Sequence, residues 1–179
     1  GWVSGVLLWR RLGALVAVGA LVVGCSSGPR AVSAQEQAAI EDEFWVLLPQ
    51  VVEDTGLEPS SFKYASGRTY DPQKVADRSF TPQGVCDSSG EETLYRIELA
   101  MDTFDVDDVQ HPASEYTARS ERMRALWESR GFEVKNAGPY GNGYEIVYVT
   151  EQGITVSYYV GDKGESIVLR SECVLSEDG

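Results

Sequence analysis

The sequence has 179 residues, with 28 acidic side chains against 15 basic ones and a formal net charge of −13 at pH 7. This length suits one domain with a single core. The acidic balance disfavours binding to nucleic acid, or to anionic lipid through a basic patch, because both need Lys and Arg to neutralise phosphate groups.

The first 25 residues have the pattern of an export signal. Two arginines precede an apolar run over residues 12–24, which is shorter than the roughly 20 apolar residues of a membrane-spanning helix. The run leads into Leu-Val-Val-Gly-Cys at residues 21–25, a stretch that resembles the bacterial lipobox. The resemblance implies that residues 1–24 are a signal peptide and that Cys25 becomes the lipidated N-terminus. An uncleaved anchor over residues 7–23 is the alternative, and the arginines interrupt it.

Residues 25–33 are predicted to be the lipidated end and a flexible tether, because Ser, Gly and Pro dominate them. A cysteine is required at the first position, since only a thiol forms the stable thioether to diacylglycerol. Two or three acyl chains such as palmitate hold a protein on a membrane for long times. We therefore expect an exported protein on the extracytoplasmic side of the cell membrane, attached through the lipid on Cys25.

The three cysteines fit this interpretation. Lipidation uses Cys25 and leaves Cys86 and Cys173 as a pair, which predicts one disulfide in an oxidising compartment. The alternative is a metal or redox site built on the two thiols. It lacks His or Cys partners nearby in the sequence.

Residues 34–55 predict an amphipathic helix, with a kink or a break at Pro49. The apolar positions recur at helical spacing and form one stripe. They are Ile40, Phe44, Leu47, Leu48, Val51 and Val52. The opposite face is acidic, which disfavours a helix lying on a membrane, and we expect the stripe to pack on the core.

The next segment, residues 57–86, is punctuated by Gly and Pro and predicts a long loop, with a short strand at 61–64. A long ordered loop is a candidate cover for a binding site. Residues 93–101 alternate apolar and polar side chains and predict a half-buried strand. The acidic turn that follows, residues 102–108, lacks the central Gly and distal Glu of a calcium loop.

His111 is the only histidine, and it precedes Pro112, where a helix over residues 113–130 should begin. With no second His and no Gly-x-Ser-x-Gly motif, a zinc site or a Ser/His/Asp triad is not expected, and His111 is predicted to cap the helix or lie on the surface. The sequence therefore predicts no catalytic residue, no metal, no cofactor and no enzyme.

The last third predicts an antiparallel meander of strands at 132–136, 144–150, 154–160 and 166–175. The Gly-Asn-Gly at 141–143 leads into a strand and not into a helix, so it indicates a turn and not a phosphate cradle. The expected fold is a single α+β domain over residues 34–176. Two main helices pack in it on a mainly antiparallel sheet of about five strands, tied by one disulfide.

Tyrosines are the one crowded chemical feature. Tyr144 and Tyr148 share a face of one strand, and Tyr158 lies on the next, so these rings are candidate ligand-facing groups for a glycan or a lipid. The favoured interpretation is that they pack on a half-buried sheet, where aromatic side chains are common.

The lipobox, the helix, Cys86, and the Gly-Asn-Gly-Tyr-Glu at 141–145 before strands ending near Cys173 together resemble the mycobacterial lipoprotein family LppA. This family comprises small actinobacterial surface lipoproteins without an established activity. The resemblance implies an envelope location and a disulfide, and it carries over no catalytic residue. We expect a non-enzymatic binding or accessory role, with an envelope protein, a glycan or a lipid as ligand. The alternative is a carrier of lipid or glycolipid with an apolar pocket between helices and sheet.

Overall fold

The computed structural model describes residues 31–32, 34–74, 85–87, 94–104, 110–139, 141–172 and 174–176. The predicted signal peptide, Cys25 and Cys173 lie outside these ranges. Among the described helices, none is both long and apolar enough to cross a membrane.

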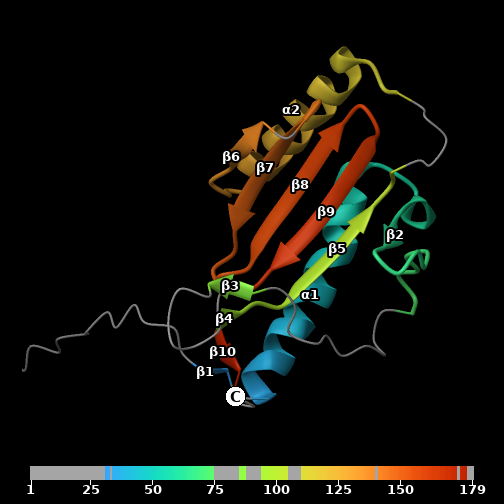
Figure 1. Ribbon diagram of the computed structural model, residues 1–179. Helices are drawn as coiled ribbons and strands as arrows, with labels where there is room; N and C mark the ends of the chain where they lie inside the picture. Colours follow the sequence, from blue (N-terminus) through green and yellow to red (C-terminus); the bar gives the residue numbers. More distant parts are fainter. Residues whose placement is uncertain are drawn as a thin grey trace, which may run out of the picture.

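Two helices lie on one face of a six-stranded antiparallel sheet (Figure 1). The helices are α1 (Ala34–Thr55) and α2 (Ala113–Ser129), and a 3₁₀ turn covers Pro59–Ser61. The sheet order is β2-β5-β9-β8-β7-β6. These strands are β2 (Lys63–Tyr64), β5 (Glu98–Asp102), β6 (Lys135–Pro139), β7 (Gly143–Val149), β8 (Thr155–Gly161) and β9 (Gly164–Arg170). The α+β prediction is confirmed. The sheet has six strands and not five, because the short strand expected at 61–64 pairs with the edge of β5.

A second, smaller sheet has the order β1-β10-β4-β3. Its strands are β1 (Ala31–Val32), β3 (Val85–Asp87), β4 (Leu94–Tyr95) and β10 (Val174–Ser176). The strands predicted at 93–101 and 166–175 are therefore each divided between the two sheets. The division falls at Ser171, whose N–H donates to the Ile97 carbonyl (2.9 Å) while its hydroxyl accepts from the Ile97 N–H (2.8 Å). A side-chain oxygen thus replaces a backbone partner where the strands change sheet.

The small sheet brings together the regions of the two later cysteines. Cys86 lies on β3, and β10 begins directly after Cys173. Strand β4 lies between β3 and β10 in this sheet. No disulfide is seen among the residues that the structure describes. Since Cys173 lies outside them, the pairing stays a prediction.

Strand β6 begins at Lys135, three residues later than the predicted start at 132. Phe132 and Val134 pack against the core before the strand begins, and the Phe132 ring stacks on Tyr148 at 4.1 Å between ring centroids. The strand then continues to Pro139, past the predicted end at 136, because a register shift between Asn136 and Gly138 admits Gly138 at a φ of 116°.

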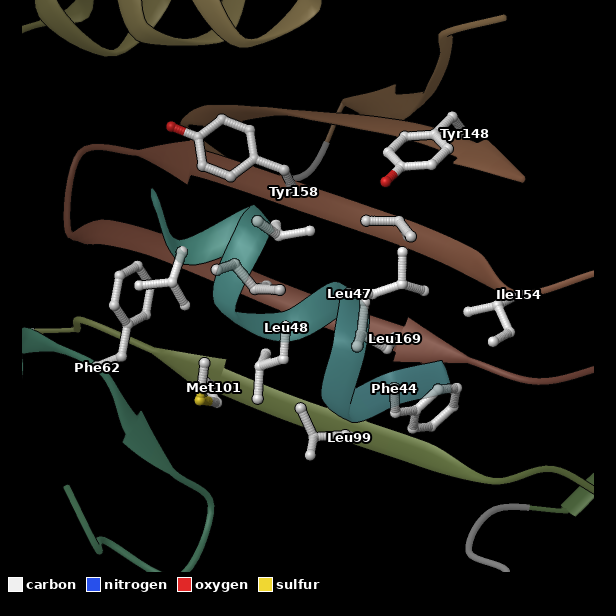
Figure 2. Close-up of a cluster of buried hydrophobic side chains, with 14 of the residues drawn as sticks. Phe44, Leu47, Leu48, Phe62, Leu99, Met101, Tyr148, Ile154, Tyr158 and Leu169 are labelled. Atoms are coloured by element: carbon white, nitrogen blue, oxygen red, sulfur yellow. The ribbon is translucent and has the colours of Figure 1, made fainter. Parts of the chain in front are cut away.

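The core fills the space between the helices and the large sheet (Figure 2). The predicted stripe of α1 is its centre: Phe44, Leu48, Val51 and Val52 are each at most 2% exposed. The helix continues through the exposed Pro49 without a break. From α2, Trp127 is fully buried and makes edge-on contacts with Tyr148 at 4.6 Å and Tyr158 at 6.3 Å. One large indole therefore joins α2 to two central strands.

Asp54 ties the two helices together. Its carboxylate is buried at the end of α1 and accepts from the Trp127 Nε1–H at 3.1 Å and from both terminal nitrogens of Arg130 at 2.7 Å. Arg122 of α2 donates to the carbonyls of Asp54 and Thr55, at 3.1 and 2.6 Å, which satisfies the open C-terminal end of α1. Hydrogen bonds to a buried charge are among the strongest that a fold contains.

We expect Asp54→Ala to lower the free energy of unfolding by roughly 2–4 kcal/mol, because the Trp127 N–H and the Arg130 guanidinium both lose their partner. Urea denaturation followed by tryptophan fluorescence measures the effect. The matched control is Glu53→Ala, which removes an exposed carboxylate at the neighbouring position. Equal stability of the two variants would show that Asp54 does not hold the helices.

Candidate functional site

Neither described helix covers the other side of the large sheet, which is called the open face (Figure 1). Alternation along β7, β8 and β9 sends one set of side chains under the helices and the other set to this face. A hollow of about 650 Å³ lies there. Its lining residues are Phe104, Ala137, Gly141, Glu145, Val147, Tyr159, Ser166, Val168 and Arg170.

The strand register arranges this lining in rows across the sheet. One row places Glu145 beside Tyr159 and Tyr159 beside Ser166. The next row is formed by Val147, Ser157 and Val168. Polar groups thus alternate with apolar ones over neighbouring rows, and the hollow offers both hydrogen-bonding groups and apolar surface to a ligand.

Two polar side chains of the hollow are held in place. The Ser157 hydroxyl donates to the Glu145 carboxylate, and Arg170 donates from Nε to the Glu98 carboxylate at 2.8 Å. The terminal nitrogens of Arg170 make no hydrogen bond with the residues that the structure describes. The hollow therefore presents a fixed carboxylate and a guanidinium with donors available to a ligand.

An aromatic pair forms one end of the hollow. Tyr159 contacts Phe104 edge-on, with ring centroids 6.2 Å apart. Burial, followed by the charge of Asp162, raises the pKa of the Tyr159 hydroxyl. The ring lies over two glycines that face each other across β7 and β8: a Cβ on Gly143 would come 2.6 Å from the Tyr159 hydroxyl, and one on Gly161 would come 2.2 Å from it. Gly143, the last glycine of the predicted turn, thus leaves the space that the Tyr159 ring occupies.

Of the three tyrosines singled out by the sequence, two belong to the core. Tyr148 is 4% exposed and Tyr158 is fully buried, and both contact Trp127 under α2. Tyr144 is exposed and its ring contacts Tyr116 of α2 at 5.9 Å. None of the three lines the open hollow. The tyrosine that does, Tyr159, follows Tyr158 directly and by alternation faces the other way, which is the signal that could have identified it.

Possible metal ligands and His111 were also considered in the sequence. The described residues contain no group of three or more His, Cys, Asp or Glu side chains that could hold a metal ion. Residues 105–108 of the acidic turn lie outside the described ranges. His111 is partly exposed, precedes the N-cap residue of α2, Pro112, and places Nδ1 3.6 Å from an oxygen of Glu115.

The buried phenols make the fold sensitive to alkali. Burial raises the pKa of Tyr70 and of Tyr148 from 10.0 to about 12. Each therefore contributes stability that is complete below the unfolded pKa of 10.0 and is lost as the pH rises through about 12. We expect urea-unfolding free energies to fall over this window. The absorbance of tyrosinate should appear in two phases, the later one coinciding with unfolding. A single phase matching that of the urea-unfolded chain would contradict the burial of these phenols.

No known protein family matches the chain, no curated protein matches it, and no solved structure matches it.

Proposed function

We propose that this protein is a non-enzymatic, membrane-tethered lipoprotein of the cell envelope that binds its ligand on the open face of the large sheet. The observation that carries the binding role is the 650 Å³ hollow, which combines a carboxylate, a guanidinium and an aromatic pair. Support for the tether comes from the lipobox-like residues 21–25. The acidic composition disfavours attachment to anionic lipid through a basic patch, so attachment would depend on a covalent lipid.

The position of the hollow suits a tethered protein. The described chain begins at β1, in the small sheet at one end of the molecule, and the predicted tether precedes it (Figure 1). Phe104, at the aromatic end of the hollow, follows the far end of β5. A tether leaving from β1 would therefore turn the aromatic end of the hollow away from the membrane.

The lining favours a polar ligand with a flat apolar side, such as a segment of an envelope glycan. Glu145 accepts hydrogen bonds, Arg170 donates them, and the Tyr159 ring offers the apolar contact. A lipid carrier would need an apolar cavity between helices and sheet. Core side chains of α1 and α2 pack on the sheet there, and a hollow of about 210 Å³ beside α2 is too small for a lipid, which gives the carrier alternative less support.

The resemblance to the LppA lipoproteins and the Cys86–Cys173 disulfide belong to the same proposal. Cys86 lies on β3 of the small sheet, and β10 of the same sheet begins one residue after Cys173 in the sequence. A disulfide there would tie the ends of a domain that works in an oxidising compartment. Mass spectrometry with alkylation before and after reduction tests it: two thiols alkylated without reductant would exclude the bond.

The anchor is tested by Cys25→Ala. Loss of the only thiol in the lipobox-like stretch should move the protein from the membrane fraction to the soluble fraction, because no acyl chain can be attached. Fractionation and immunoblotting measure this. Cys86→Ala is the control and should remain in the membrane fraction. Retention of Cys25→Ala in the membrane would contradict lipidation at this site.

The binding face is tested by Val168→Arg, which puts a long charged side chain into the hollow. Titration with soluble fragments of cell-wall polysaccharide, followed by nuclear magnetic resonance, should shift the signals of Tyr159 and Arg170 in the wild type. The substitution should weaken binding by about tenfold or more, a loss of ~1.4 kcal/mol.

The matched control is Val46→Arg, at an exposed valine of α1 that is 68% accessible. It adds the same charge outside the hollow and should leave binding unchanged. Equal loss in both variants would indicate a nonspecific effect of charge. Shifts confined to the helix face would contradict the open-face site.

A further inference from the structure

The Tyr159 side chain lies along the surface of the sheet. Gly161 is the next residue of β8 on the same face, roughly 6.6 Å further along the strand. A Cβ on Gly161 would come 2.8 Å from Cζ of Tyr159, so the ring extends over this glycine. Gly143 pairs with Gly161 from β7, and a Cβ there would come 2.7 Å from Cε2 of the same ring. The ring therefore has the backbone of two neighbouring strands directly beneath it.

The other side of this ring borders the open-face hollow. No described helix covers the open face, and Tyr159 is only partly buried and belongs to the lining of the hollow. The Phe104 ring stands nearly perpendicular to the Tyr159 ring, at an interplanar angle of 80°. Phe104 is itself 43% exposed. The aromatic pair thus offers a ligand an apolar floor and an apolar wall.

Polar groups flank the Tyr159 ring on both sides. Glu145 of β7 and Ser166 of β9 are its cross-strand neighbours, and both line the hollow. One oxygen of Glu145 accepts from the Ser157 hydroxyl, and the other accepts no hydrogen bond from the residues that the structure describes. Cross-strand neighbours have Cβ atoms roughly 4.5–5.5 Å apart, so this oxygen is within reach of a hydroxyl on a ligand that lies on the ring.

Negative charge predominates at this end of the hollow. Glu145 lies beside the ring, and Asp102 lies in the same row of the sheet, two strands away on the other side. The Asp102 carboxylate accepts from the Phe104 N–H at 3.1 Å, which holds it next to the aromatic pair. Burial, and then the charge of Asp162, raises the pKa of the Tyr159 hydroxyl, so a third carboxylate is close. A carboxylate on a ligand would be repelled here.

The basic groups of the open face do not offset these carboxylates. Arg170 lies four positions along β9 from the row of the ring, roughly 13 Å away, and donates to Glu98. Arg96 is 3.3 Å from the same carboxylate, and Lys135 forms an ion pair at the start of the edge strand β6. Lys163, in the turn after β8, is exposed and forms no ion pair with the described residues. The aromatic end therefore suits a neutral ligand group better than an anionic one.

We propose that the aromatic pair is a subsite for a neutral pyranose ring, which lies on the open side of Tyr159 and donates a hydroxyl to Glu145. A pyranose suits this place because the C–H groups on one side of the sugar form an apolar, weakly positive surface, and the face of an aromatic ring is negative. Phe104 contacts the edge of the sugar. The inference rests on the proposed binding function of the open face and narrows its ligand to a glycan of neutral sugars.

Nuclear magnetic resonance on the purified full chain tests the subsite, with cellotetraose and chitotetraose as two neutral probes. A sugar on Tyr159 lies in the ring current of the phenol, so its C–H protons should shift upfield on binding. The matched control ligand is the tetramer of β-1,4-linked glucuronate, which has the shape of cellotetraose and adds carboxylates. It should bind about tenfold more weakly, because it faces Glu145 and Asp102. Equal binding of the acidic tetramer would overturn the neutral subsite.

Substitutions at the ring separate stacking from a structural effect. Tyr159→Ala should weaken binding of the neutral probes about tenfold and abolish the upfield shifts, whereas Tyr159→Phe keeps the ring and should preserve both. The matched control is Tyr144→Ala, at a tyrosine that is 46% exposed on the helix side, and it should leave binding unchanged. If Tyr159→Ala does not fold, Phe104→Ala removes the exposed ring of the pair and should also weaken binding.

The outcomes distinguish this subsite from the open-face function. Binding of a neutral probe that Val168→Arg weakens and Tyr159→Ala does not would overturn the subsite and leave the open-face function in place. Binding of another cell-wall fragment on the open face, with neither neutral tetramer bound, would do the same. Absence of all binding on the open face of the wild type would overturn both.

Discussion

The buried carboxylate of Asp54 is the constraint on which the arrangement of the domain depends. Helices α1 and α2 share one face of the sheet, and their buried side chains join those of the strands in one core cluster. Asp54 supplies the specific connection, because the Trp127 indole can bury fully only if its N–H has an acceptor inside the core. The carboxylate in turn needs Arg130 to balance its charge. The Asp54 side chain thus connects the two helices, accepts the hydrogen bond of the buried indole and pairs with the charge of Arg130.

This arrangement leaves the two faces of the sheet with different tasks. The aromatic side chains of β7 and β8 that contact α2 point to one side of the sheet, so the opposite side makes none of these contacts. Tyr158 and Tyr159 are neighbours in the sequence and lie on opposite faces of the sheet. The Tyr158 ring is buried in the core, and the Tyr159 ring lines the open-face hollow. The sheet can in this way hold the core on one side and present a shaped surface on the other.

Much of the fold could be predicted because local patterns decide it. The apolar residues from Phe44 to Val52 recur at helical spacing, and they lie in α1. The bounds of β7 and β8 agree with the predicted strands to within one residue. The exchange of strands at Ser171 was not predictable, since apolar residues continue on both sides of it and the break depends on a hydroxyl meeting Ile97 from a distant strand. The same holds for Glu165 and Asp54, whose burial follows from Arg119 and Arg130 brought close by the tertiary fold.

The small sheet has a mechanical consequence for a chain held at its N-terminal end. Tension arriving at Ala31 is applied first to the two-residue strand β1, which runs parallel to β10, and next to α1. Parallel neighbours pulled along their length resist in shear, so their hydrogen bonds share the load instead of opening one at a time. Strands β7 and β8 are bonded to neither β1 nor β10, so a pull from the proposed tether acts first on the small sheet and not on the part of the open face that they form.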